Sequence, residues 1–78
     1  RSLAEQIHRA ACSVPSNIDE ANGLAGGRRI EHFRYALGSA REVTTQLRLA
    51  QAFGYVDDIA SPLALLDRVR AMLWRLTR

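Results

Sequence analysis

The sequence predicts an all-α protein, an up-and-down antiparallel helical bundle with three helices in its 78 residues. Apolar residues recur at steps of three and four almost throughout, and no alternating apolar and polar stretch is long enough to predict a strand. Glycine and proline cluster at residues 22–27 and 54–62, and these two breaks divide the chain. We expect one domain, residues 1–78, with helices at about 2–21, 29–53 and 62–77.

The first expected helix contains a proline, which raises the question of whether Ser13 belongs to a catalytic loop. The apolar stripe from Leu3 to Ala21 runs past Pro15 without losing its phase, as a continuous helix requires. Pro15 removes one backbone hydrogen bond, to the carbonyl of Ala11, so we expect either a kink or a helix that restarts at the proline. Pro15 is therefore interpreted as part of a structural motif.

A polar row of Ser13, Asn17 and Glu20 lies along one shoulder of the same helix. Such a trio could suggest catalysis, but no general base lies beside the serine at helical spacing, and His8 is on a different side. We expect the row to form hydrogen bonds to neighbouring helices. Asn17 and Glu20 are accordingly assigned to the structural motif with Pro15.

The second expected helix has two apolar sides. The broader side is typical of a bundle core, and it consists of Phe33, Ala36, Leu37, Ala40, Val43, Thr44, Leu47 and Ala50. The core of one bundle covers only one side of a helix, so the other strip is expected to pack against a missing helix or another subunit, and it is assigned as an oligomer interface. That strip consists of Tyr35, Leu49 and Phe53, with Glu42 and Gln46 interleaved.

Glycine and proline give further signals in and after this helix. Gly38 lies in mid-helix, where glycine costs roughly 1 kcal/mol relative to alanine, and the close approach of another backbone would justify that cost. Gly54 is expected in the left-handed position that ends the helix, with Tyr55 making the hydrophobic contact beyond it. Ser61 is the expected N-cap of the third helix, with Pro62 at its first position.

The third expected helix has its own apolar stripe, and Trp74 lies off it. The stripe is expected to face the core, and it consists of Leu65, Leu66, Val69, Leu73 and Leu76, with Met72 at its edge. Trp74 lies among charged residues, where it could anchor an interface or stack on a nucleic-acid base. An interface or the edge of the core is favoured over nucleic acid, and the side of Trp74 and Arg70 is the candidate complement to the strip on the second helix.

The basic residues are all arginine, and the net charge is +3. Arg34, Arg41 and Arg48 are seven residues apart and share one edge of the second helix. Together with Arg28 and Arg29 they are the candidate nucleic-acid-binding residues, because guanidinium groups suit phosphate. The alternative, which we favour, is a solvated or salt-bridged edge.

No catalytic or metal-binding motif is present in the sequence. It contains no CxxC, no HExxH, no nucleophile elbow and no phosphate-binding glycine loop after a strand. We therefore expect no enzymatic activity, no cofactor, no metal site and no small-molecule substrate. The rival class is a small hydrolase or phosphate-handling enzyme that uses Ser13 or the turn at residues 26–29.

The single cysteine and the hydropathy indicate the cellular setting. Cys12 cannot form a disulfide within the chain, which favours a reducing compartment, and a buried or half-buried thiol is expected. No apolar run approaches the roughly 20 residues of a membrane span. We expect a cytoplasmic protein with no membrane partner.

The order of several motifs resembles a known family. The segments are residues 13–20 (SVPSNIDE), 33–42 (FRYALGSARE), 45–47 (TQL) and 54–55 (GY). They are similar to the four-helix bundle family whose members include proteins encoded in the intervening sequences of bacterial 23S rRNA genes. The accessory variability determinant of diversity-generating retroelements is similar to this family. In one departure, Glu20 is followed here by Ala21-Asn22-Gly23, where the family usually has Glu-Gly soon after Asn-Ile.

This resemblance implies an architecture and an assembly but no catalytic residues. It implies a fourth helix upstream of the three predicted here and a homopentamer around a central axis. The retroelement member engages a reverse transcriptase and nucleic acid, which implies RNA or DNA as a further partner. We thus expect a non-enzymatic homo-oligomeric scaffold, with a dedicated nucleic-acid-binding accessory protein as the alternative.

Overall fold

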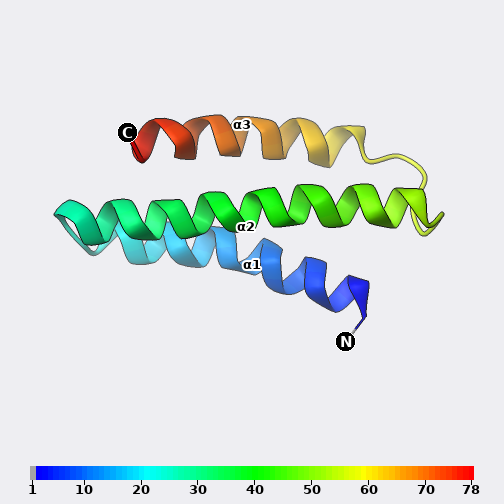
Figure 1. The fold of residues 1–78 in the computed structure, drawn as a ribbon, viewed down its shortest axis with the longest axis horizontal. Coiled ribbons are helices and arrows are strands. Elements are labelled where there is room, and N and C mark those ends of the chain that lie inside the picture. Colours follow the sequence, from blue (N-terminus) through cyan, green and yellow to red (C-terminus); the bar gives the residue numbers. More distant parts are fainter. Residues whose placement is uncertain (1) are drawn as a thin grey trace.

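The computed structural model describes residues 2–78, which fold into three α-helices. They are α1 (Leu3–Asn22), α2 (Gly26–Ala52) and α3 (Ala60–Leu76), and residues 2–78 contain no strand. Successive helices run in opposite directions, and α2 lies between the other two (Figure 1). The predicted all-α bundle is confirmed, and each predicted helix lies within three residues of the observed one.

Helix α1 is continuous through its proline, as its apolar stripe predicted. The Ser2 hydroxyl caps its first turn by accepting a hydrogen bond from the Glu5 amide at 3.1 Å. Pro15 lies inside the helix and has no N–H to donate to the Ala11 carbonyl. One half of α1 follows α2 closely, while its N-terminal half diverges from α2 (Figure 1). This divergence opens a cleft that is described below.

Helix α2 ends as predicted but begins earlier. Gly54 has φ +79°, and its amide donates to the Gln51 carbonyl at 3.0 Å while the Tyr55 amide donates to the Ala50 carbonyl at 2.9 Å. This is the Schellman arrangement, which only a residue tolerant of positive φ allows. At the other end the helix begins at Gly26, three residues before the predicted start, because the turn from α1 needs only residues 23–25.

The predicted N-cap of α3 is wrong by two residues. The helix begins at Ala60, and the Asp58 carboxylate accepts a hydrogen bond from the Ala60 amide at 2.9 Å. Ser61 and Pro62 are therefore the second and third helical residues. Proline is tolerated there because the first four N–H groups of a helix have no intrahelical partner.

The core lies on both flanks of α2, and α1 and α3 do not approach each other within 8 Å between Cα atoms of residues 2–78. The buried cluster takes one residue from α1 and one from α3, with the rest from α2: Ala21, Phe33, Ala36, Leu37 and Leu73. The Cα atoms span 43 × 25 × 13 Å, so the molecule is one thin layer of helices. The predicted core arc of α2 is confirmed, with Leu47 half-buried.

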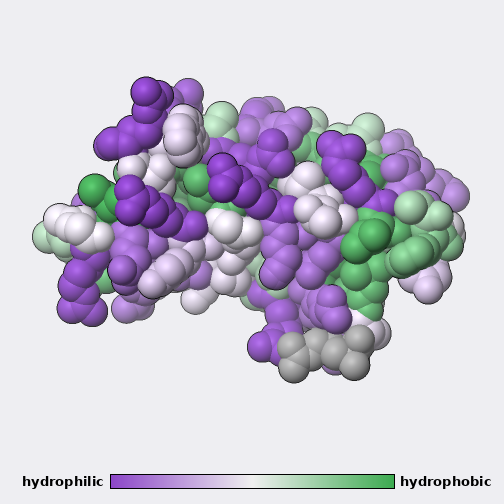
Figure 2. All heavy atoms as spheres, viewed as in Figure 1, coloured by the Kyte–Doolittle hydropathy of each residue, from purple (hydrophilic) through white to green (hydrophobic). Residues whose placement is uncertain are grey.

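The predicted core stripe of α3 is only partly confirmed. Leu73 is fully buried, whereas Leu65 is 55 % exposed and Leu76 is exposed together with Met72. These three side chains lie on the side of α3 that faces away from α2, where no helix of residues 2–78 covers them. On the face shown in Figure 2, apolar surface gathers at the end where α2 leads into α3, and hydrophilic residues dominate the middle.

Candidate functional site

The predicted interface residues of α2 lie together on one exposed strip. Tyr35 is 51 % and Phe53 is 63 % exposed, and Leu49 and Glu42 are exposed with them. Successive members of the strip are seven, seven and four residues apart, which keeps them on one side of the helix. Three large apolar side chains thus face solvent along α2, on the side that neither α1 nor α3 covers.

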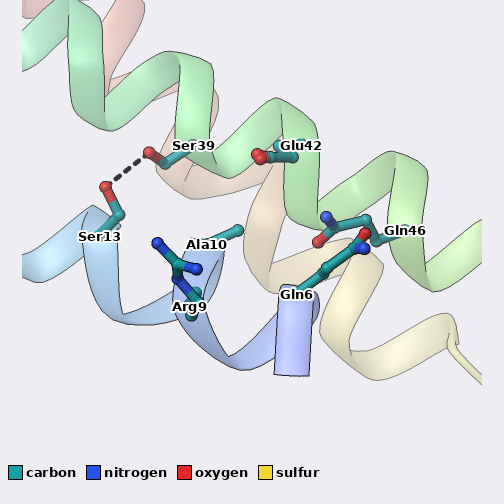
Figure 3. A pocket seen from close by; sticks show the side chains of 7 residues that line it. All are labelled: Gln6, Arg9, Ala10, Ser13, Ser39, Glu42 and Gln46. Atoms are coloured by element: carbon teal, nitrogen blue, oxygen red, sulfur yellow. Dashed lines mark hydrogen bonds between the residues drawn. The ribbon is translucent and has the colours of Figure 1, made fainter. Parts of the chain in front are cut away.

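Next to this strip, a cleft of about 410 Å³ opens where α1 diverges from α2 (Figure 3). Its lining is mostly polar: Gln6, Arg9, Ala10 and Ser13 from α1, and Ser39, Glu42 and Gln46 from α2. The Gln46 Oε1 atom is buried and has no hydrogen-bond partner in residues 2–78. An acceptor removed from water without a donor is costly.

The cleft is closed at one end by a polar network between α1 and α2. The Ser39 hydroxyl donates to Ser13 Oγ at 2.8 Å, and the Asn17 amide donates to Ser13 Oγ at 3.0 Å and to the Ser13 carbonyl at 2.9 Å. Asn17 Oδ1 lies 3.1 Å from His32 Nδ1. An amide oxygen can only accept, so in this contact Nδ1 of His32 is the donor.

This network confirms the predicted hydrogen bonds from the polar row of α1 for Ser13 and Asn17. Glu20 lies exposed beside the α1–α2 turn and is outside the network. The two side chains that contact Ser13 Oγ both donate to it. A serine nucleophile needs the opposite arrangement, a base that accepts its proton.

Gly38, for which the sequence predicts the close approach of another backbone, is exposed in the middle of α2. Apart from the neighbouring backbone of α2 itself, an added Cβ would meet no atom of residues 2–78 within 4 Å. Within residues 2–78, therefore, no backbone approaches Gly38 closely. The expected close approach stays a prediction about a second chain.

The candidate nucleic-acid-binding arginines fall into separate groups. Arg34, Arg41 and Arg48 are all exposed on the side of α2 next to α3. Arg28 lies about 120° around the helix from Arg34, at 3.6 residues per turn. Arg29 places its guanidinium 5.5 Å from the centre of the Phe33 ring. Arg28 and Arg29 therefore do not extend the row.

Beside the arginine row, α2 and α3 form a groove of about 490 Å³. Arg41 from α2 and Arg70 and Trp74 from α3 line it. The structure thus places Trp74 against the arginine row. The Tyr35 strip lies on the other edge of α2.

Further contacts complete the description of the strip and of α1. Tyr35 packs edge-on against His32, with ring centres 5.3 Å apart. Its hydroxyl hydrogen-bonds to Glu31, whose negative charge also opposes the phenolate, and both effects raise the pKa of Tyr35 above its ordinary 10.0. Cys12 was expected to be buried but is exposed, with Sγ 3.7 Å from His8 Nε2, because it lies on the outer side of α1.

Sequence reasoning missed the exposed apolar side of α3, although its signal was present in the sequence. Leu65, Met72 and Leu76 are spaced by seven and four residues, as one helix side requires.

Among residues 2–78, no three His, Cys, Asp or Glu side chains gather in a way that could hold a metal ion. No helix in the same range has the length and apolar character needed to cross a membrane.

Comparison with known proteins agrees with the motifs in α1 and α2. The model of the 23S rRNA-intervening sequence protein family matches residues 1–75. The chain belongs to this family. Searches of curated proteins and of solved structures returned no match. Membership of the intervening-sequence family is thus established by a match that includes all three helices almost entirely.

Proposed function

We propose that this member of the intervening-sequence family is a non-enzymatic, homo-oligomeric scaffold. The exposed strip on α2 is the observation that carries the proposal. Large contiguous apolar surfaces on small proteins mark interaction sites, and here Tyr35, Leu49 and Phe53 are aligned on one helix side. A second copy of the chain is the proposed occupant.

The cleft beside the strip supplies polar specificity for the same interface. Gln46 offers a buried acceptor, and Glu42 offers an exposed carboxylate that forms no ion pair within residues 2–78. We propose that an arginine or a backbone N–H group of the neighbouring subunit donates to them. Gln46 Oε1 is buried and unpaired within residues 2–78, so the Gln46 amide would turn outward to accept such a donor.

The exposed side of α3 has a different proposed occupant. Leu65, Met72 and Leu76 on α3 and the half-buried Val14 and Ile18 on α1 belong to two helices that do not approach each other. A fourth helix between α1 and α3 would cover both sets and complete a four-helix bundle. We propose that this helix lies upstream of residue 1, as the family resemblance implies.

A closed ring fits these surfaces better than a two-fold dimer does. A two-fold contact pairs one patch with itself, whereas a ring joins two different patches of each subunit. The strip on α2 is apolar and the cleft beside it is polar. The surface of the neighbouring subunit that contacts this strip must therefore be a different patch. We propose five subunits, the number that the family resemblance implies.

The absence of enzymatic activity is part of the proposal. Both neighbours of Ser13 Oγ donate hydrogen bonds to it, so neither can act as its base in this arrangement. We also propose a cytoplasmic location, which the exposed, unpaired Cys12 thiol supports. Ester turnover that disappears in Ser13→Ala would instead establish the rival hydrolase.

Light scattering coupled to size-exclusion chromatography tests the scaffold. At micromolar concentration we expect a closed oligomer for the natural protein and smaller species for Leu49→Asp and Tyr35→Asp, since each places a charge in the proposed interface. Ala64→Asp is the control, because it adds the same charge at an exposed position of α3. A monomeric natural protein, or equal effects of Leu49→Asp and Ala64→Asp, would contradict the proposal.

A second candidate function, nucleic-acid binding, is favoured by one observation. Arg34, Arg41 and Arg48 are exposed, and within residues 2–78 none of them forms an ion pair with an acidic side chain. At 1.5 Å per residue their Cα atoms are about 10 Å apart along α2. Binding of labelled RNA that weakens steeply with salt would support this function, and binding indifferent to salt would oppose it.

A further inference from the structure

Trp74, the one tryptophan of the chain, lines the groove between α2 and α3. Its side of α3 is turned toward Arg41 of α2, and the residue is 51 % exposed. A tryptophan that serves packing alone buries its ring, because the ring carries a large apolar area. This one leaves about half of its surface available to another molecule.

The groove around Trp74 is positively charged. Arg41 and Arg70 line it, and Arg34 and Arg48 continue the row along α2 on either side of Arg41. The opposing charge is Asp67, which lies 3.3 Å from Arg70 in an ion pair with substantial solvent exposure. Exposed pairs of this kind are weak and screened by salt, so Arg70 can exchange Asp67 for a phosphate.

The Trp74 ring already has a planar cation near it. The guanidinium carbon of Arg78 lies 5.8 Å from the ring centre. An exposed cation–π contact is generally weaker than the stacking of a base on an aromatic ring. A base can therefore take the place of Arg78 over the ring. The Arg78 guanidinium is then free to bind the backbone of the same strand.

We propose that the α2–α3 groove binds single-stranded nucleic acid, with a base stacked on Trp74 and phosphates on Arg41 and Arg70. The inference rests on the second candidate function. It also changes the role of Trp74, which was assigned from the sequence to the subunit interface and which is here assigned to nucleic-acid binding. A single strand is specified because a ring in a groove can stack only on a base that is not paired within a duplex. An acidic protein partner would use the arginines but would have no need for the ring.

The fluorescence of the single tryptophan makes the test direct. A single-stranded oligothymidine of about 12 nucleotides, within the range that such grooves cover, is titrated into the assembled protein while Trp74 emission is followed. The anisotropy of a labelled strand is measured in parallel across salt concentrations. We expect the single strand to quench Trp74, and a duplex of equal length to quench it far less.

The variants separate stacking from charge. Trp74→Ala should weaken binding of the strand about tenfold and Trp74→Phe much less, since a phenyl ring still stacks. Arg41→Ala should lower the slope of log affinity against log salt by about one. Arg75→Ala, which removes the same charge from an exposed position of α3 outside the groove, is the matched control and should change binding little. Circular dichroism and light scattering confirm that each variant folds and assembles.

Three results would overturn the inference. If Trp74 in the assembled protein is shielded from acrylamide before any strand is added, the ring belongs to the subunit interface. If strands bind with an ordinary salt slope but Trp74→Ala and Arg41→Ala behave like Arg75→Ala, nucleic-acid binding stands and the groove is wrong. If no strand binds even at low salt, the groove and the second candidate function both fail.

Discussion

Gly38 allows the proposed assembly to be tested through one methyl group. It lies exposed in mid-helix, and a Cβ at this position meets no atom of residues 2–78 within 4 Å other than the neighbouring backbone of α2. Gly38→Ala should therefore add helix propensity to the single chain without a clash, raising its free energy of unfolding by about 1 kcal/mol. For a domain of this size, that corresponds to an increase of about 4–8 °C in Tm.

In the assembled protein the same substitution should act in the opposite direction. If a neighbouring backbone packs against Gly38, the new methyl group holds the two chains apart and weakens their association. The assay is Tm measured over a wide range of protein concentration, because an oligomer that dissociates on unfolding melts at higher temperature when it is more concentrated. We expect Gly38→Ala to melt higher than the natural protein when dilute and to depend less on concentration.

Gly27→Ala is the control for this experiment. It adds the same methyl group in the first turn of α2, also in open space, but far along the helix from Gly38. We expect it to leave the concentration dependence of Tm unchanged. A dilute Gly38→Ala protein that melts no higher than the natural one would refute the propensity argument. An unchanged concentration dependence would refute the close approach at Gly38.

Three further predictions concern single contacts. Gly54→Ala places a side chain at φ +79° and should lower the free energy of unfolding by about 1–2 kcal/mol in a urea titration. Asn17→Ala leaves Ser13 and His32 without a shared partner and should cost about 1–3 kcal/mol by the same measurement. Unchanged urea midpoints would contradict either expectation. Glu31→Gln should lower the pKa of Tyr35 toward 10.0 in an ultraviolet titration of the Tyr55→Phe protein. The pKa of Tyr35 is higher in the native state than in the unfolded state, where it is about 10. The stability from the Tyr35–Glu31 interaction is therefore present below about pH 10 and is lost as pH rises through the native pKa. A pKa that stays fixed in Glu31→Gln would contradict the assignment.

Features set by near neighbours in sequence were predictable. The end of α2 at Gly54 was predicted because positive φ and the hydrogen bond from the Tyr55 amide involve only adjacent residues. The continuous α1 was predicted because the stripe keeps its phase past Pro15. The start of α3 was misplaced because two side chains near it, Asp58 and Ser61, can both accept a hydrogen bond from a free N–H group at a helix start. The Asp58 carboxylate accepts from the Ala60 amide, so the helix begins ahead of Ser61.

Features that depend on how helices meet were not predictable. Periodicity assigns Asn17 and His32 to sides of their helices, but only the register between α1 and α2 brings them to 3.1 Å. Periodicity likewise assigns Leu65 to an apolar side of α3, but it does not determine whether another helix covers that side. The groove that joins Trp74 to Arg41 has the same origin, because its two walls come from different helices.

The central position of α2 has a consequence for the order in which the chain folds. Since α1 and α3 each pack on α2 and not on each other, two helical hairpins can form independently, each closed by a short connection. Helices α1 and α3 each give the buried cluster one residue, but α1 is also joined to α2 by the Ser13–Ser39 and Asn17–His32 hydrogen bonds, so α3 should detach first in local unfolding. Amide hydrogen exchange should then be slowest in the middle of α2 and faster throughout α3.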